Sequence, residues 1–437
     1  MKTGTLFRAA MILLAPSALA AQTMDTTATP ITLAEAIRLA QANSVSTVQA
    51  RGTIRTSSAA VKQSYAAFLP TFSLSAGTTK QSGDRFDTQG NLVPFTGNPT
   101  SYSTGLSSSL ELFDGGRRFF DVKAAKADVD AAEAAETVSR YNVALQVKQQ
   151  YYNILAARES ESAARAQVQQ AEQQLRASSL RLRAGAAIVS DSLRSVVALG
   201  NARLALLTAQ NNLQVANQTL TRLVASRTTV TASAADTIDA PVAIPSVAEL
   251  EALVNKAPAI EQAEAQLDAA HAAVRSAKTS FLPTVSMSFN RSGSGLDPAF
   301  GIGDKRYAYN QNLSFRMNFP LLNGLNREVS VARAIVAEDV AEVQARDAKL
   351  LARQTLVQSL AQMRTAQEQV QIQAVSVAAA TEDLRVQQRR YELGATTLLD
   401  LLTSQTQLDN ARSALIRARY DYRVAKAQLE ALIGRDL

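Results

Sequence analysis

The stretch "RLRAGAAIVSDSL" at residues 181–193 returns later in the chain as "RRYELGATTLLDLL" at residues 389–402. Each copy has a glycine followed six residues later by an aspartate, and Gly185 with Asp191 is shifted by 209 residues relative to Gly394 with Asp400. Glycine readily adopts the left-handed conformation that ends a helix. We therefore expect each copy to be the turn between an outgoing and a returning helix, with a carboxylate at the positive start of the returning helix.

A similar offset, 213 residues for one pair of segments and 209 for another, recurs along the chain, which indicates a duplicated unit. "YAAFLPTFSLSAG" (65–77) returns as "KTSFLPTVSMSFN" (278–290), and "GNARLAL" (200–206) returns as "DNARSAL" (409–415). A period this long indicates a duplicated domain and not a solenoid. We predict a first structural repeat at 21–224, a linker at 225–245 and a second repeat at 246–437, each with a helix, a strand pair, a long helix and a return helix.

The first residues are typical of an export signal. Lys2 and Arg8 precede an apolar stretch, and Ala18-Leu19-Ala20 fits a cleavage site. We expect residues 1–20 to be a signal peptide and the mature chain to be exported. No later segment holds about 18 consecutive apolar residues, so the sequence predicts no membrane-spanning helix.

Four segments alternate apolar and small polar residues with a period of two, which predicts strands with one apolar face. The predicted strand pairs are 70–83 with 101–113 and 283–292 with 307–320. Half-buried hairpins of a soluble sandwich are one interpretation. An outer-membrane barrel is the favoured one, because the polar faces carry Ser, Gly and Asn and few charges.

Four strands cannot close a barrel, and open edges in lipid would leave unpaired backbone groups. Two copies of the chain would give a barrel of eight strands that is filled by its own side chains, whereas three copies leave a lumen. The smallest assembly that makes a pore is therefore a cyclic homotrimer.

The helical runs are long and carry a seven-residue repeat. Residues 117–184 would span about 100 Å as one helix, far more than a bilayer is thick. A seven-residue spacing predicts coiled-coil packing of the returning helices. The residues with this spacing are Leu199, Leu206, Leu213 and Leu220, and then Leu408, Leu415, Tyr422 and Leu429.

Composition argues against several classes of function. The chain has no cysteine, one histidine (His271) in an alanine-rich stretch, and a net charge of +7 without a basic block. We expect no enzymatic activity, no cofactor, no metal site and no nucleic-acid partner.

The whole pattern resembles the TolC-like outer-membrane efflux protein family (outer membrane factors, or channel-tunnels). "FLP" precedes each first strand, "FDGGR" precedes the first long helix, and the "GA…D" tips complete the likeness, with "RRYELGATTLLDLLTSQTQLDNAR" as its most specific stretch. The resemblance implies a mainly α fold with β: long antiparallel helices form a trimeric α-helical barrel, joined to a transmembrane β-barrel with four strands per chain.

The resemblance also implies function and partners. Members of the family form an outer-membrane channel with a periplasmic helical tunnel, and serve tripartite efflux pumps or type I secretion systems. The implied partners are a homotrimer, a periplasmic adaptor (membrane fusion) protein, an inner-membrane transporter and outer-membrane lipid. The implied location is the bacterial cell outer membrane.

Three residues match the family's periplasmic gate or entrance: Asp191, Tyr391 and Asp400. We expect the Tyr391 hydroxyl to bond Asp191 in the closed state. Thr396 stands where the family pattern has an arginine. The arginines near enough to replace it are Arg181, Arg183, Arg389 and Arg390.

The small residues at the two turns are the predicted adaptor-contact tips: Gly185, Ala186, Gly394 and Ala395. The alternative function is a periplasmic adaptor-like helical-hairpin protein without its own pore. An adaptor would carry one hairpin, however, and not two copies each accompanied by a strand pair.

Overall fold

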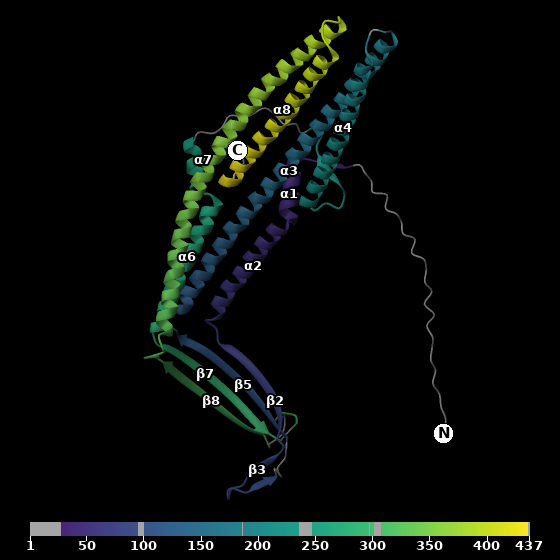
Figure 1. Cartoon of the computed structure of the whole chain (residues 1–437). Coiled ribbons are helices and arrows are strands. Elements are labelled where there is room, and N and C mark those ends of the chain that lie inside the picture. Colours follow the sequence, from purple (N-terminus) through teal and green to yellow (C-terminus); the bar gives the residue numbers. More distant parts are fainter. Residues whose placement is uncertain are drawn as a thin grey trace, which may run out of the picture.

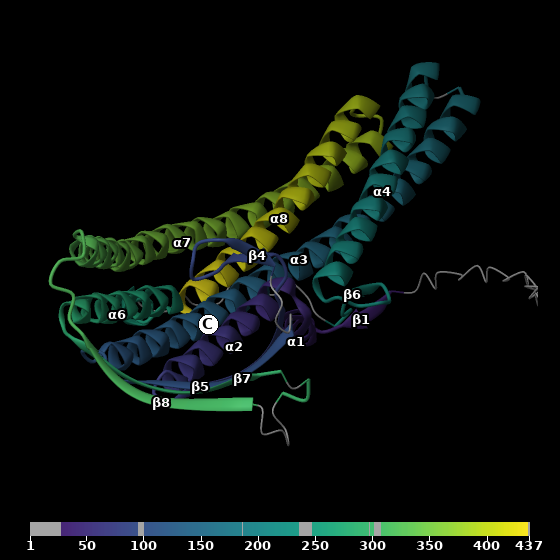
Figure 2. The ribbon, with the colours of Figure 1, turned by 90° about the horizontal axis from the view of Figure 1, so that it is seen from below.

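The structure, a computed structural model, describes residues 28–94, 100–185, 187–235, 247–296, 298–300 and 307–435. The predicted signal peptide at 1–20 and residues 236–245 of the predicted linker lie outside the described residues. Two long helical hairpins extend away from a curved four-stranded sheet, and their tips lie at the opposite end of the molecule from the sheet (Figure 1, Figure 2).

Helices form most of the chain, and each repeat has the same order of helices. The first repeat holds α1 (Leu33–Asn43), α2 (Val45–Ala66), α3 (Arg117–Arg183) and α4 (Val189–Leu223). The second holds α5 (Val247–Val254), α6 (Pro258–Lys278), the short 3-10 helix η1 (Thr279–Phe281), α7 (Asn326–Glu392) and α8 (Leu398–Ile433). The two longest helices, α3 and α7, have 67 residues each, about 100 Å at 1.5 Å per residue. Among the described helices, none is long and apolar enough to cross a membrane.

The returning helices pack on the outgoing helices through the predicted seven-residue spacing. Leu199 and Leu220 are buried on α4, and Leu408, Tyr422 and Leu429 are buried on α8. The intervening members of the pattern are half-buried: Leu206, Leu213 and Leu415. This leucine spacing thus marks the face that joins each hairpin.

The four-stranded sheet has the order β2-β5-β7-β8 and is antiparallel throughout. Its strands are β2 (Thr71–Lys80), β5 (Thr100–Phe113), β7 (Thr284–Gly295) and β8 (Tyr307–Asn318). The predicted pairs had nearly these bounds, although β7 runs three residues past the predicted end at 292. Residues 84–94, which lie between the predicted strands 70–83 and 101–113, hold a small hairpin of β3 (Asp84–Phe86) and β4 (Leu92–Pro94).

The register of the sheet gathers apolar side chains on one face and small polar side chains on the other. Leu74 lies opposite Leu106, and Met287 lies opposite Phe315. On the other face, hydroxyls bond across the strands: Ser73 Oγ lies 2.5 Å from Ser107 Oγ, and Ser288 Oγ lies 2.8 Å from Ser314 Oγ. The apolar side chains stay exposed in the single chain, with Leu74 at 81% and Phe315 at 65%.

Part of the predicted linker at 225–245 forms a strand. Residues Val230–Ala232 form β6, a parallel partner of β1 (Thr29–Ile31). Both strands pack beside Tyr151 of α3, whose hydroxyl donates to Ile31 O (3.0 Å) and accepts from Ser233 N (3.0 Å). Val230 and Ala232 are buried there, so apolar burial holds this segment in place.

The repeats contact each other inside the chain through the sheet, through packed helices and through ion pairs. The sheet crosses from one repeat to the other where β5 pairs with β7. Further along, Lys148 of α3 meets Glu430 of α8 with 2.6 Å between Nζ and Oε2, and both side chains are nearly buried. Lys426 Nζ lies 3.7 Å from the other oxygen of Glu430. Removing one member of such a pair would leave a buried charge uncompensated.

The junction between sheet and helix explains the repeated "FLP" and the arginine after each glycine turn. In the first repeat the Arg118 guanidinium stacks 4.7 Å from the Phe68 ring, and its Nε donates to Asp114 (3.0 Å). In the second repeat Arg327 stacks 4.9 Å from the Phe281 ring, and its Nη1 donates to Pro320 O (2.7 Å). The two motifs, 50 residues or so apart along the chain, thus meet where the long helix begins.

Candidate functional site: the tips of the two hairpins

The tip of the first hairpin is closed by Gly185, which has φ +71°. A Cβ built on this glycine would meet nothing within 4 Å, so the backbone conformation is what demands glycine here. The N-cap of α4 is Ile188, which supplies no side-chain hydrogen bond. Asp191 lies in the first turn of α4, and its Oδ1 is 3.9 Å from Arg194 Nη1.

The tip of the second hairpin has the same glycine geometry, with Gly394 at φ +73°, but a complete helix cap. Thr397 accepts a hydrogen bond from Asp400 N (3.3 Å), and Asp400 Oδ2 accepts from Thr397 N (3.1 Å), which is a capping box. Asp400 Oδ2 also accepts from the hydroxyls of Thr397 (2.6 Å) and Thr396 (2.9 Å). These bonds, those from Thr397 first, lower the pKa of Asp400 below its ordinary value.

One contact bridges the two tips through Tyr391 at the end of α7. The Arg181 guanidinium of α3 lies 4.5 Å from the centre of the Tyr391 ring, and Arg181 Nη1 donates to Tyr391 O (3.4 Å). The ring also packs at the edge of an apolar cluster of Leu384, Leu398, Leu401 and Leu408. Arg181 therefore ties the end of α3 to the end of α7.

The structure brings only some of the predicted site residues together. Asp191 and Asp400 stand on different hairpins, and among the described residues the Tyr391 hydroxyl makes no hydrogen bond to Asp191. Thr396, at the position of the family's arginine, is part of the Asp400 cap. Of the predicted tip residues, Gly185, Gly394 and Ala395 are exposed, and Ala186 lies outside the described residues.

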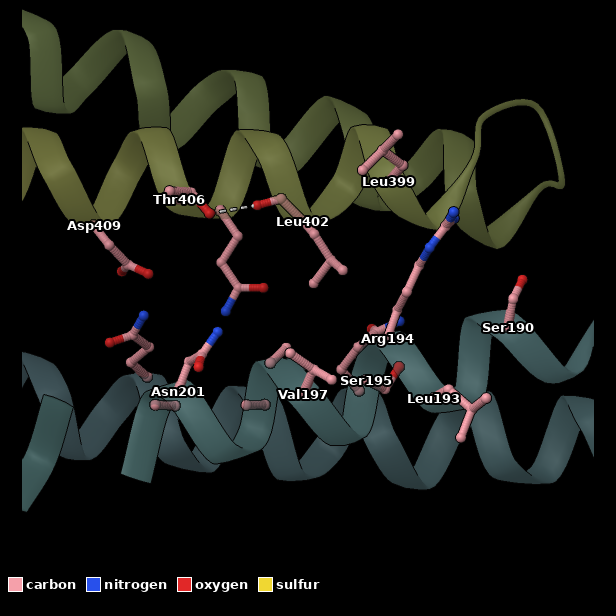
Figure 3. Close-up of a pocket in the computed structure, with 16 residues that line it drawn as sticks. Ser190, Leu193, Arg194, Ser195, Val197, Asn201, Leu399, Leu402, Thr406 and Asp409 are labelled. Carbon is pink, nitrogen blue, oxygen red and sulfur yellow. Dashed lines mark hydrogen bonds between the residues drawn. The ribbon is translucent and has the colours of Figure 1, made fainter. Parts of the chain in front are cut away.

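A groove runs from the tips along the inner faces of the two hairpins. It encloses about 580 Å³ between α4 and α8, with side chains of α3 at its floor. Leu402 and Val197 point toward each other across it, and Asp409 faces Asn201 at the end farther from the tips (Figure 3). Sequence reasoning missed Asp409. The available signal was the departure of "DNARSAL" from "GNARLAL", where Asp409 replaces Gly200.

The sequence matches the family described as "Outer membrane efflux protein" over residues 36–226 and 250–435. The chain therefore belongs to the outer membrane efflux protein family, which confirms the resemblance and the expected location in the outer membrane. The family is a transport class and not an enzyme class. The adaptor-like alternative finds no support in this match.

Named relatives and solved structures agree with this family. The probable efflux pump outer membrane protein TtgC of Pseudomonas putida is 26% identical over 184 residues, 42% of this chain and 37% of TtgC. The pyoverdine export outer membrane protein OpmQ of Pseudomonas aeruginosa is 26% identical over 76% of this chain and 69% of OpmQ. The structure of the outer membrane protein VceC from Vibrio cholerae matches with a TM-score of 0.75 at 18% identity, over 92% of this chain and 96% of VceC, which shows the shared fold.

Proposed function

We propose that this chain is the outer-membrane channel-tunnel of a tripartite efflux pump or type I secretion system. Three copies would join their sheets into one twelve-strand barrel and their hairpins into one periplasmic tunnel. The observation that carries the proposal is the sheet itself, whose edge strands β2 and β8 each have one side that pairs with no strand among the described residues. In lipid such edges cost several kcal/mol for each unpaired backbone group, so neighbouring copies must pair them.

The two faces of the sheet support the same assembly. The exposed leucines, phenylalanines and methionines of one face suit lipid, and the hydroxyl pairs of the other face suit a water-filled lumen. The alternation holds along most of the sheet, with a register shift between Glu111 and Phe113 and with Arg291 opposite Gln311 on the apolar face. A soluble sandwich would need a second sheet over the apolar face, and the described residues contain none.

The hairpin tips suit the periplasmic end of such a tunnel. We infer that Asp191, Tyr391 and Asp400 form its gate or entrance, and that Gly185, Ala186, Gly394 and Ala395 contact a periplasmic adaptor. Large apolar side chains flank these small residues and stand exposed, with Ile188 at 65% and Leu393 at 83%. Exposed apolar residues around a small-residue turn favour contact with another protein. The adaptor would in turn receive substrate from an inner-membrane transporter.

Two substitutions on β8 test the barrel with matched chemistry. Leu313→Arg places a charge on the apolar face, whereas Asn312→Arg places it on the neighbouring position of the polar face. A charge on the lipid face costs roughly 2–4 kcal/mol near the midplane of the membrane. We expect Leu313→Arg to deplete the heat-sensitive oligomer in the outer-membrane fraction, and Asn312→Arg to assemble normally.

The assembled protein should then conduct ions in planar bilayers. Asn312→Arg should lower cation conductance relative to the wild type, because its charge would line the pore. A folded oligomer whose conductance equals that of bare lipid would overturn the channel proposal. Equal assembly of the two arginine variants would overturn the assignment of the lipid face.

A further inference from the structure

The groove between α4 and α8 combines an apolar end with one unpaired carboxylate. Near the tips it is lined by Leu193, Val197, Leu399 and Leu402 (Figure 3). Farther along, Asp409 of α8 faces Asn201 of α4. The volume of about 580 Å³ falls within the range of roughly 300–1,000 Å³ that is typical of small-molecule sites.

The carboxylate of Asp409 is placed unusually for a residue on a long helix. Its Oδ2 is fully covered and has no hydrogen-bond partner among the described residues. Burial raises the pKa of Asp409, and the nearby Arg412 opposes that rise. A covered, unpaired oxygen costs free energy, and the field of a positive charge in the groove would offset part of that cost without direct contact with the oxygen.

Asp409 is the carboxylate at the end of the groove farther from the tips, and the other charged residues lie on either side of that position. Arg194 of α4 lies at the tip end, 3.9 Å from Asp191, and the lining side chains of α3 include the uncharged Gln167 and Gln174. Beyond Asp409, α8 continues with Arg412, Arg417 and Asp421, which line a second and more polar hollow. The described residues contain no group of three or more metal-ligating side chains, so a metal ion is a poor candidate.

We propose that this groove binds a monovalent organic cation with an apolar body, such as a lipophilic ammonium or phosphonium ion. The positive charge would lie against Asp409, and the apolar body would cover the leucines and Val197. Bringing a cation beside a partly desolvated carboxylate gains more than the same contact in water, because the local dielectric is lower. The inference goes beyond the proposed channel function, since a pore can conduct with this groove empty.

The test measures binding to the purified full-length protein in detergent by equilibrium dialysis against matched micelles. The probe is tetraphenylphosphonium, a permanent cation, and triphenylphosphine oxide serves as a neutral compound of similar shape. We expect saturable binding of the cation, weakened about tenfold or more by Asp409→Asn, which removes the charge and keeps the size. Binding of the neutral compound should be the same in both proteins.

Two further variants separate charge from shape. Ala198→Phe fills the groove from α4, where Ala198 lines it, and should weaken both probes. Asp347→Asn removes a carboxylate from an exposed position of α7 outside the groove and should change neither.

Three outcomes would overturn the proposal. The first is uptake of the cation no greater than by micelles alone, and the second is equal affinity of the wild type and Asp409→Asn. The third is an equal loss in Asp347→Asn, which would indicate a general effect of net charge. The bilayer conductance of the same preparations is recorded separately, so a failure here is distinct from a failure of the channel proposal.

Discussion

The two hairpin tips share one sequence pattern but are built differently. Both turn on a glycine in the left-handed region, and both place an aspartate early in the returning helix. Asp400 is held by hydrogen bonds from Thr396 and Thr397, whereas the charged neighbour of Asp191 is Arg194 at 3.9 Å. The aspartate at the same repeat position is thus a helix cap in one tip, whereas in the other it is half-buried and forms no capping box.

This difference shows that, after duplication, equivalent aspartates in the two repeats can take different roles. A carboxylate at a helix start either satisfies backbone N–H groups or stays available to other ligands. At the second tip, Thr396 and Thr397 donate hydrogen bonds to the Asp400 carboxylate and hold it at the start of α8. At the first tip the cap position is Ile188, which has no side-chain oxygen to offer.

The largest effect should come from the glycines on which both tips depend. Gly185→Val and Gly394→Val force a β-branched residue into the left-handed region, at a cost of roughly 1–2 kcal/mol for chirality alone. We expect export to fall strongly while trimers still assemble, with Gly185→Val the more severe because its tip has no side-chain cap. Export assays alongside heat-sensitive oligomer gels measure both quantities.

Gly200→Val is the matched control for these variants. Gly200 lies inside α4, and a Cβ there would meet nothing within 4 Å. Export at the wild-type level in both tip variants would remove the tips from the adaptor interface.

The aspartates should separate stability from selectivity. Asp400→Asn should speed amide hydrogen exchange in the first turn of α8, because the capping box loses its charged acceptor. Asp191→Asn should leave exchange in α4 almost unchanged. In single-channel recordings both variants should lower cation preference, and Asp191→Asn should lower it more, because its carboxylate is not committed to a cap. Identical exchange and selectivity in the two variants would erase the distinction between the tips.

The bridge between the tips should give a smaller effect that depends on the ring and not on the hydroxyl. An exposed cation–π contact is worth roughly 0.5–1 kcal/mol. We expect Tyr391→Leu and Arg181→Met each to raise open probability severalfold, and the double variant to add little, because both remove one contact. Tyr391→Phe keeps the ring and should behave like the wild type.

Tyr391→Phe also decides between two interpretations of this residue. The sequence led us to expect a hydroxyl bond to Asp191, whereas the structure places the ring against Arg181. An open probability in Tyr391→Phe as high as in Tyr391→Leu would favour the hydroxyl.

The smallest effect concerns pH at the second tip. The folded-state pKa of Asp400 lies below its ordinary value of 3.8, so its stabilising effect is complete above that value and is lost as the pH falls through the folded-state pKa. Amide exchange at Thr397 and Asp400, corrected for its intrinsic pH dependence, should therefore speed up only in strong acid. Asp400→Asn should lack this acid-induced component.

Much of the fold was predictable because it rests on local signals. The glycines, the leucine spacing and the period-two alternation act within a few residues, and each marks its element in the structure. Thr32, a residue type that favours the first position of a helix, accepts a hydrogen bond from Glu35 N at the start of α1. Side-chain capping, period and backbone preference are properties that one segment carries by itself.

The parts that escaped prediction are contacts between distant segments. β5 pairs with β7, and β6 pairs with β1. These pairings depend on contacts between distant segments, which the pattern within one segment does not predict. Arg181 was one of four candidate arginines, and only the geometry places it on Tyr391. Asp409 follows the buried Leu408 in sequence, but that it borders a groove with residues of α3 and α4 follows only from the tertiary structure.

The pairing of β5 with β7 implies that the two repeats could be made as separate polypeptides. The register runs from Tyr102 paired with Gly295 to Phe113 paired with Val285, and the Lys148–Glu430 pair adds a second join between the halves. The covalent connection between Ala235 and Val247 is therefore not what aligns them. Two polypeptides, one ending and the other starting between those residues, should reassociate when they are co-expressed. By the same reasoning, a protein of one repeat could build the proposed twelve-strand barrel from six copies. Fusion of two such genes would halve the number of chains that must assemble.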